Sequence, residues 1–294
     1  MPLPADSLRD LIDYADRNSF DDWPHETVIP GLSLVRSRRT TEFTCVRYEP
    51  IFCLVLQGAK QSFIGDKALT FERGHALIVS IDLPTTARVV EASPQAPYLA
   101  LALQLDTRLL RELVSEHPEP AAADPSASRS GMRVQSVAEP LTEAMLRLFR
   151  LNETPQDITA LAPLLVREIH YRLLRGPDGE LLRNLVQPDT HTARLSRAIS
   201  RIRRDYTATL TVQDLAREAG MSASSFHEHF RALTGTSPLQ FQKSMRLLEA
   251  QRRLLDGEGS VSAVAFAVGY ESPTQFSREY SRKFGRPPRA DRAA

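Results

Sequence analysis

The sequence predicts an α+β protein, with an N-terminal β-barrel that carries accessory helices and a C-terminal all-α domain in which a linker helix joins two helix-turn-helix units. Three observations support this prediction. Short apolar runs separated by turn residues occupy residues 32–105, amphipathic helical patterns follow up to residue 187, and a helix-turn-helix pattern occurs twice in the last hundred residues. We therefore divide the chain into residues 1–115, 116–190 and 191–294.

The composition is typical of a globular protein. With 294 residues, of which 42% are hydrophobic, the chain can form two compact domains and is neither disordered nor fibrous. Its apolar runs are shorter than the ~18 residues needed to cross a bilayer. The N-terminus has neither the basic region nor the apolar stretch of a signal peptide, and two cysteines argue against a disulfide framework. These features predict a cytoplasmic protein without a membrane partner.

Strand patterns follow one another closely in the first part of the chain. The expected strands cover residues 42–48, 51–57, 61–64, 68–71, 76–81, 88–91 and 98–105. Turn residues, among them Gly58, Gly65 and Gly74, separate them. Because the strands are short and closely spaced, a small barrel is favoured over a βαβ sheet.

Features of catalysis are missing from this region. A metal site in such a barrel requires several histidines and a carboxylate that converge on one ion. Residues 32–105 contain the single histidine His75, in a turn before a strand, where a surface or hydrogen-bonding role is usual. A Gly-rich phosphate loop and a nucleophile elbow are also absent from the sequence. We therefore expect no metal, no cofactor and no enzymatic activity.

Candidates for sensing a signal lie on the predicted strands. Cys45 and Cys53 flank Pro50, and a bend there can bring them together. The simpler interpretation is that both are buried as small hydrophobic residues. The alternative is a thiol that reacts with an electrophile or oxidant, with Arg47 or Lys60 lowering its pKa.

An apolar ligand pocket is a further interpretation of the same strands. Its candidate residues are Trp23, Tyr48, Phe52, Gln57 and Phe63, although aromatic side chains on strands usually belong to the core. The combined set of candidate ligand-binding or sensing residues is Trp23, Cys45, Tyr48, Cys53, Gln57 and Lys60.

Residues 116–190 combine a loop with helices. Residues 116–131 are rich in Pro, Ala and Ser and predict a mobile loop. Two amphipathic helices are expected after it, one with the apolar residues Leu141, Met145, Leu148 and Phe149, and one with Ile158, Leu161, Leu165, Ile169 and Leu173. A short helix within residues 176–187 precedes a linker at Pro188 and Asp189. These helices either cover the barrel or pair between subunits.

A degenerate repeat dominates the C-terminal part, because residues 215–235 return as residues 264–285. Gly220 and Gly269 are equivalent and end the first helix of each copy, since glycine accepts the positive φ of a tight turn between helices. Phe226 and Phe230 in the first copy correspond to Phe276 and Tyr280, and both pairs are spaced as core residues of a second helix.

Start signals mark the second helix and the joining helix. Ser272, Pro273 and Gln275 form an N-cap, a first-turn proline and a capping-box partner. Ser237, Pro238 and Gln240 repeat this signal, and the joining helix carries Phe241, Met245, Leu248 and Leu255 on one side. At about 1.5 Å per residue, a helix of roughly 18 residues spans about 27 Å, close to the ~34 Å between successive major grooves. An earlier helix with Leu195, Ile199, Ile202 and Tyr206 is expected to pack beneath the first unit.

The outward positions of the two second helices carry polar and basic side chains suited to base edges and phosphates. The residues expected to contact DNA are Ser224, Ser225, His227, Glu228 and Arg231 in the first copy, and Thr274, Gln275, Ser277, Arg278 and Arg282 in the second. An ordinary solvated helix face explains one copy equally well, but two copies joined by one helix favour binding to double-stranded DNA. Charge agrees, since residues from His191 onward contain 17 Lys and Arg against 10 Asp and Glu, whereas the preceding residues contain 20 against 26.

The C-terminal domain resembles the DNA-binding domain of the AraC/XylS family of bacterial transcription regulators. The residues that carry the resemblance are Ala219, Gly220, Met221, Ser222, Phe230, Thr234, Gly235, Ser237, Pro238, Arg246 and the segment 269–288. Glu228 departs from the family, because many members have a basic or amide side chain there. More loosely, the segments 49–80, 82–89 and 97–106 resemble the cupin-like N-terminal domain of one AraC subgroup, which implies sensing of a small molecule or another signal.

These observations predict a homodimeric regulator of transcription that binds promoter DNA, contacts RNA polymerase and responds to a small-molecule effector or a redox or electrophile signal at its N-terminal domain. A constitutive or architectural DNA-binding protein without a ligand is the alternative. An alkyl-accepting repair enzyme tethered to DNA is a third class, and it is disfavoured because two cysteines are too few for a four-cysteine zinc site.

Overall fold

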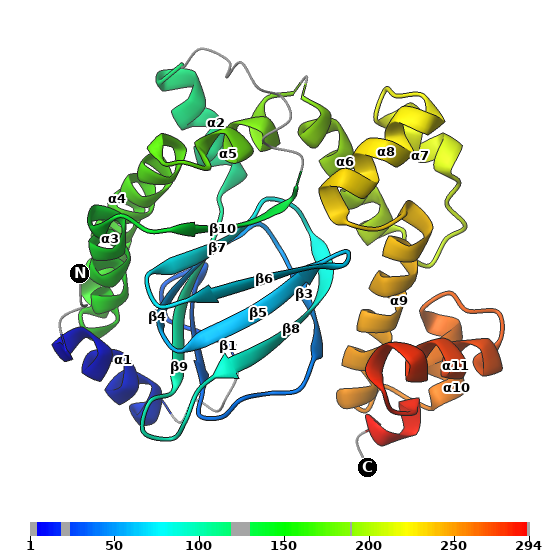
Figure 1. Ribbon diagram of the computed structural model, residues 1–294, viewed down its shortest axis with the longest axis horizontal. Helices are drawn as coiled ribbons and strands as arrows, with labels where there is room; N and C mark the ends of the chain where they lie inside the picture. Colours follow the sequence, from blue (N-terminus) through cyan, green and yellow to red (C-terminus); the bar gives the residue numbers. More distant parts are fainter. Residues whose placement is uncertain (1–4, 19–23, 119–129, 189, 293–294) are drawn as a thin grey trace.

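The computed structural model describes residues 5–18, 24–118, 130–188 and 190–292. A β-domain occupies the centre, one group of helices covers one of its sides, and a second group lies on the opposite side (Figure 1). This arrangement confirms the α+β fold expected from the sequence. Trp23 and most of the loop expected at residues 116–131 lie outside the described residues, as does Asp189.

The β-domain consists of two sheets that face each other. The described strands of the first sheet are, in spatial order, β1 (Pro24–Glu26), β2 (Leu32–Ser37), β9 (Tyr98–Gln104), β4 (Ile51–Gln57), β7 (His75–Val79) and β10 (Met132–Ser136). Those of the second are β3 (Thr44–Tyr48), β8 (Leu83–Glu91), β5 (Ala59–Ile64) and β6 (Lys67–Glu72). All of these strands pair antiparallel, which agrees with the short connections in the sequence.

Three strands and one half-strand lie outside the sequence-based assignment. β1 has three residues, β2 precedes the series of strands expected from residue 42 onward, and β10 follows that series after helix α2. The first half of β8 contains Pro84, which normally argues against a strand interior. β10 pairs with β7, so the sheet extends beyond residue 115 of the chain.

Helices cover the outer face of the larger sheet. They are α1 (Ala5–Arg17), α2 (Thr107–Glu116), α3 (Glu139–Arg150), α4 (Pro155–Arg175) and α5 (Gly179–Val186), with a short 3-10 turn, Leu151–Glu153, between α3 and α4. Leu34, Leu101 and Ile78 of the sheet share one core with Met145 and Ile169 of these helices. The α3 and α4 helices therefore cover their own β-domain. Leu161, which the sequence pattern assigns to the apolar face of α4, is 44% exposed.

The C-terminal domain contains the two predicted helix-turn-helix units. The elements are α6 (His191–Arg204), α7 (Val212–Glu218), α8 (Ala223–Thr234), α9 (Pro238–Leu255), α10 (Val261–Ala267), α11 (Pro273–Phe284) and the 3-10 turn Pro288–Ala290. The long helix α9 runs beside the β-domain and connects the two units (Figure 1).

Two cores are built around α9. Phe226, Phe230 and Phe241 are buried in the first unit. Phe276 and Tyr280 are buried in the second, together with Leu254 of α9. Met245, Leu248 and Leu255 line one hollow of the surface, as expected for one side of the helix, and Leu255 is 54% exposed whereas Leu254 is buried.

Candidate functional site

The turn of each helix-turn-helix unit fixes where the second helix begins. Gly220 has φ +63° and Gly269 has φ +87°, so both use the left-handed conformation that the sequence predicts. Ser222 caps α8 by accepting a hydrogen bond from the backbone N–H of Ser225 at 3.2 Å. Ser272 caps α11 in the same way through the N–H of Gln275 at 3.3 Å.

The capping box expected at α11 is only half formed. The Gln275 side chain donates from Nε2 to Oε1 of Glu279, at 3.2 Å, one turn further along the helix. Glu279 is buried and also accepts hydrogen bonds from Tyr270 at 2.9 Å and Lys243 at 3.1 Å. This network joins α11 to α9 and to the turn that precedes α11.

The side chains expected to contact DNA lie on the accessible faces of α8 and α11. Ser225 and Ser277 are half-buried, and the other eight are exposed. Within the described parts of the chain, Arg231, Arg278 and Arg282 make no ion pair with a carboxylate. Their guanidinium groups are therefore available for phosphate groups or base edges.

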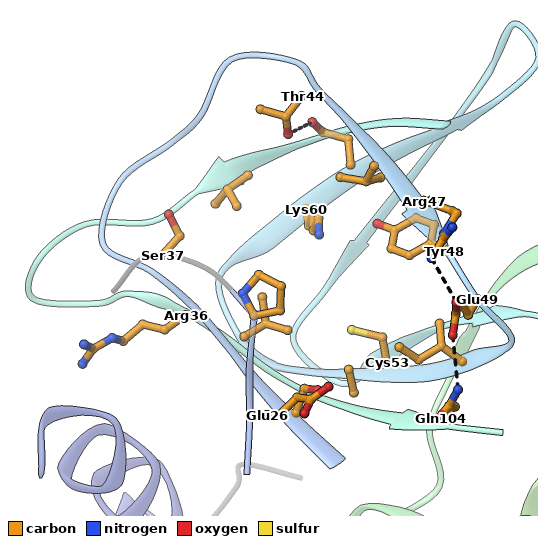
Figure 2. A pocket seen from close by; sticks show the side chains of 18 of the residues that line it. Glu26, Arg36, Ser37, Thr44, Arg47, Tyr48, Glu49, Cys53, Lys60 and Gln104 are labelled. Carbon is orange, nitrogen blue, oxygen red and sulfur yellow. Dashed lines mark hydrogen bonds and ion pairs between the residues drawn. The ribbon is translucent and has the colours of Figure 1, made fainter. Parts of the chain in front are cut away.

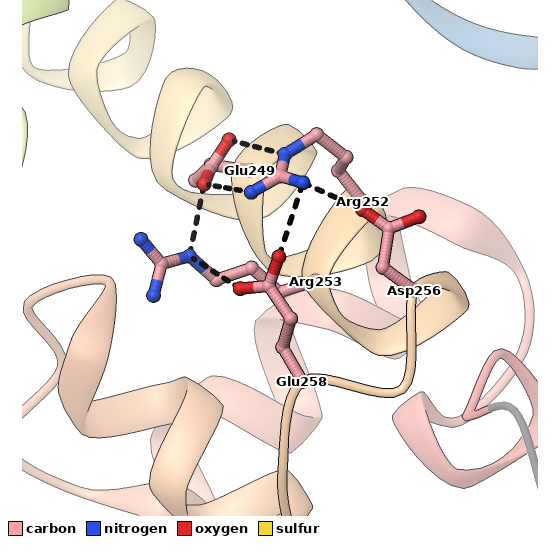
Figure 3. A network of polar contacts seen from close by, with 5 residues as sticks. All are labelled: Glu249, Arg252, Arg253, Asp256 and Glu258. Atoms are coloured by element: carbon pink, nitrogen blue, oxygen red, sulfur yellow. Dashed lines mark hydrogen bonds and ion pairs between the residues drawn. The ribbon is translucent and has the colours of Figure 1, made fainter.

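Basic side chains at the end of α9 have a different environment. Arg252 pairs with Glu249 at 3.0 Å and with Glu258 at 3.2 Å, and Arg253 donates to Glu249 at 2.9 Å (Figure 3). Asp256 completes this group of five charged residues. These ion pairs engage Arg252 and Arg253, whereas Arg231 of α8 and Arg278 and Arg282 of α11, the recognition helices, have no such partner among the described residues.

Arg246 of α9 fixes the two units relative to each other. Its guanidinium donates to the carbonyl oxygens of Tyr206 at 2.6 Å, Thr207 at 3.2 Å and Ala208 at 3.1 Å, which precede the first unit. It also donates to the carbonyl oxygen of Gly269, in the turn of the second unit, at 2.8 Å. One planar group therefore holds both units on the same helix.

A cavity of about 560 Å³ opens between the two sheets of the β-domain (Figure 2). Tyr48, Cys53 and Lys60, three of the predicted sensing residues, line it. The pocket candidates Gln57 and Phe63 do not line it, which corrects the expectation for them, and Cys45, a candidate thiol sensor, also lies outside the lining. Gln57 instead donates to the carbonyl oxygen of Pro97 at 2.8 Å. Phe52 is also outside the lining and belongs to the core on the other face of the sheet.

Several cavity residues are absent from the sequence-based set. The additional lining side chains include Ser33, Val35, Ser37, Thr44, Val46, Arg88 and Val89. The alternation along β2 and β3 could have identified these residues as a group, because every second residue of a strand faces the same side of a sheet. Which side encloses a cavity depends on how the two sheets pack.

The two cysteines lie in different sheets and are both free thiols. The expectation that a basic neighbour lowers their pKa is wrong in its net direction. Burial raises the pKa of Cys53, and the smaller opposing effect of Lys60 does not compensate. Burial likewise raises the pKa of Cys45 more than Lys283 lowers it.

The β-domain contacts the C-terminal ends of both recognition helices. At α8, the N–H of Gly131 donates to the carbonyl oxygen of Leu233 at 2.8 Å, and the Gly65 turn packs backbone to backbone against the C-cap residue Gly235. At α11, the Cys45 thiol lies 3.9 Å from the carbonyl oxygen of Lys283.

An ion pair reinforces this interdomain contact. Arg203 of α6 pairs with Asp82 at 3.0 Å and lies 3.6 Å from Glu49, which lines the cavity. Burial raises the pKa of Asp82, and Arg203 opposes this rise. The cavity wall is therefore in direct physical contact with helix α6 of the C-terminal domain.

Two classes of feature are absent from the described ranges. Residues 5–18, 24–118, 130–188 and 190–292 contain no group of three or more His, Cys, Asp or Glu side chains placed to hold a metal ion. Over the same residues, no helix combines the length and the apolar character needed to span a membrane.

Each half of the chain matches a family of known proteins. Residues 28–181 match the N-terminal region of AraC-type transcriptional regulators, and residues 215–294 match a helix-turn-helix domain. The HTH-type transcriptional regulator ExsA of Pseudomonas aeruginosa is 29% identical over 134 residues, which are 45% of this chain and 47% of ExsA. A putative AraC-like transcription regulator of Streptomyces lividans is 32% identical over 127 residues, which are 42% of this chain and 40% of that protein. The matched part is thus half or less of these relatives.

Solved structures with a similar fold include ToxT from Vibrio cholerae, in a form bound to an unsaturated fatty acid. The TM-score is 0.57 at 10% sequence identity, and the likeness covers 88% of this chain and 92% of ToxT. At this identity the comparison concerns the fold alone.

Proposed function

Because the chain belongs to the AraC-type transcriptional regulators, we propose that it binds promoter DNA through α8 and α11 and that a small molecule in the cavity of the β-domain controls this binding. The observation that carries the proposal is the combination of two capped recognition helices, which expose uncompensated arginines, with a cavity whose wall contacts the same domain. Residues 191–294 then read DNA, and the preceding residues sense the signal.

The geometry of α9 supports binding to two successive major grooves by one subunit. Its 18 residues span about 27 Å at about 1.5 Å per residue, and successive grooves on one face of DNA are about 34 Å apart. Arg231 and Arg282 are proposed to contact phosphates, whereas His227 and Gln275 are proposed to read bases. Glu228 accepts a hydrogen bond from a cytosine amino group in this scheme.

Strand β3 offers a route from the cavity to DNA. Thr44, Val46 and Tyr48 line the cavity, while Cys45, between them in sequence, contacts α11. A ligand that binds two arrangements of β3 with unequal affinity therefore shifts the orientation of the recognition helices. ToxT, crystallised with an unsaturated fatty acid, is a precedent for ligand binding by a protein of this fold.

We further propose that the protein acts as a homodimer in the cytoplasm and contacts RNA polymerase when bound to a promoter. The outer face of α4 supports the dimer, because Leu164 is 64% exposed and Leu161 and Tyr171 lie beside it at helical spacing, 44% and 39% exposed. Sedimentation of the wild type and of Leu164→Glu tests this face, and a wild-type monomer contradicts it.

Selection of bound sequences from random double-stranded DNA by the full-length protein tests the proposed function. The expected result is a motif of two elements separated by about one helical turn, and weaker enrichment by Arg231→Ala and Arg282→Ala. Arg252→Ala is the matched control, because its guanidinium is already paired with carboxylates. If wild-type protein enriches no motif, sequence-specific regulation is contradicted and the architectural alternative is favoured.

A further inference from the structure

Two cationic side chains that line the cavity, Lys60 and Arg88, have no carboxylate partner among the described residues. Four basic residues line it: Arg36, Arg47, Lys60 and Arg88. Arg36 pairs with Asp16, and Arg47 pairs with Glu49 at 3.2 Å. Arg88 donates to Gln61 at 3.1 Å and lies 4.3 Å from the ring centroid of Phe43.

Lys60 differs from Arg36 and Arg47 in having no carboxylate partner, and from Arg88 in lacking a side-chain amide oxygen as acceptor. Its side chain extends from β5 into the cavity (Figure 2), and Nζ lies 5.7 Å from the centre of the Tyr48 ring. Within residues 5–18, 24–118, 130–188 and 190–292, no Asp or Glu oxygen is within ion-pair distance of Nζ. The Tyr48 hydroxyl is hydrogen-bonded to Ser62 at 3.0 Å.

The surroundings of Lys60 act on the pKa of its ammonium in opposite directions. Burial lowers the pKa of the ammonium, but Tyr48 and Cys53 raise it, and the balance lies above the ordinary value. The Lys60 side chain is half-buried, so its ammonium is partly withdrawn from water, and an anion beside Nζ favours the charged form. A charge withdrawn from water is unfavourable unless an opposite charge accompanies it.

The remaining walls define the rest of the ligand. Val35, Val46, Ile51, Val89 and Ala102 give the cavity an apolar lining. Its volume of about 560 Å³ is within the ~300–1,000 Å³ range of small-molecule sites. The lining residues belong to strands and their connections, so no helix N-terminus supplies backbone N–H groups for a phosphate.

We propose that this cavity binds a small organic monocarboxylate with a mainly apolar body, whose carboxylate pairs with Nζ of Lys60. The inference rests on the proposed function, because it identifies the chemical class of the effector. Arg36 and Arg47 are paired with carboxylates and Arg88 is engaged by Gln61 and Phe43, so a single carboxylate on the ligand provides the counter-ion that Lys60 lacks.

Calorimetric titration of the full-length protein with matched probes tests the assignment. The probes are octanoate and phenylbutyrate, the neutral octanamide and phenylbutyramide, and the cationic octylamine. The acids are expected to bind roughly 10- to 100-fold more tightly than the amides, as for one charge-assisted hydrogen bond. Octylamine is expected to bind least, because its charge repels Lys60.

Variants of Lys60 separate charge from shape. Lys60→Met is expected to abolish the preference for acid over amide, and Lys60→Arg to retain most of it. Lys67→Met is the control, since Lys67 is exposed on β6 outside the cavity. Thermal melting identifies a variant that has failed to fold, and Lys60→Arg then carries the test. The proposal is overturned if wild-type protein binds acid and amide equally, if no probe binds, or if folded Lys60→Met retains the preference.

DNA binding measured on the same samples separates failure of the carboxylate assignment at Lys60 from failure of the proposed function. If the acids bind in the expected order but leave DNA affinity unchanged, the assignment of Lys60 stands and the effector role fails. If the protein selects a DNA motif but shows no preference for acids, the proposal for Lys60 fails and sequence-specific regulation stands.

Discussion

The contact between the β-domain and the first recognition helix can be tested with two equivalent glycines. Gly235 ends α8 with φ +74°, and Gly285 ends α11 with φ +70°. A Cβ on Gly285 meets nothing within 4 Å, whereas a Cβ on Gly235 lies 2.2 Å from the backbone N of Gly65. Gly235→Ala and Gly285→Ala therefore introduce the same backbone strain, and only the first introduces a clash between domains.

The expected losses of stability follow from the backbone strain and the clash between domains. Alanine in the left-handed region is unfavourable by about 1–2 kcal/mol in either variant. At Gly235 the clash involves backbone on both sides, so the β-domain and α8 must separate. Overpacking of this kind adds roughly 1–3 kcal/mol, and the hydrogen bond from Gly131 to Leu233 adds about 1 kcal/mol when it is lost. We expect Gly235→Ala to melt several degrees below Gly285→Ala.

Thermal melting and hydrogen exchange measure both consequences. In Gly235→Ala the amide of Gly131 is expected to exchange faster than in wild type, because its acceptor on α8 moves away. In Gly285→Ala this amide is expected to keep its protection. Equal melting temperatures together with unchanged protection at Gly131 in both variants would refute the contact between the two domains.

The remaining predictions concern DNA and pH. Arg246→Met removes four hydrogen bonds to backbone carbonyls, so we expect the free energy of unfolding to fall by about 2–4 kcal/mol. In fluorescence anisotropy, adding a second DNA element should raise the affinity of this variant less than that of wild type. An equal rise in both proteins contradicts a positioning role for Arg246. Arg231→Ala and Arg282→Ala should each lower the slope of log affinity against log salt by about 0.9, whereas His227→Ala and Gln275→Ala should change base preference, and an unchanged slope would argue against the phosphate contacts. Burial lowers the pKa of His170, which accepts from the N–H of Asp106 at 2.9 Å. Since the unfolded chain then binds more protons, stability should fall as pH drops below about 6.5, and His170→Gln should weaken this dependence in urea titrations; an identical pH profile would exclude His170 as its source.

Local sequence signals determined the C-terminal domain almost completely. The turn glycines, the serine caps and the aromatic residues at i, i+4 spacing act within one or two helical turns, so the sequence alone located α7 to α11 and the exposed faces of α8 and α11. Leu254 and Leu255 are equally apolar, and only the packing of the second unit selects which of the two is buried. Gln275 was misassigned as a capping partner because Glu279, brought close by the helix, provides a competing acceptor.

The cavity and the contacts between domains depended on tertiary structure. Alternation along a strand shows which residues share a face, but the sequence does not say whether that face packs into a core or encloses space. The sequence identifies Lys60 as a basic residue on a strand, whereas its lack of a carboxylate partner becomes apparent only in the folded protein, where the two sheets surround it. Likewise, Gly65 and Gly235 are 170 residues apart, and no local pattern links them. The sequence by itself determined the helix-turn-helix units because their stabilising interactions are local, and only the tertiary structure decided the cavity and its contact with the C-terminal domain, because those arise from residues distant in the chain.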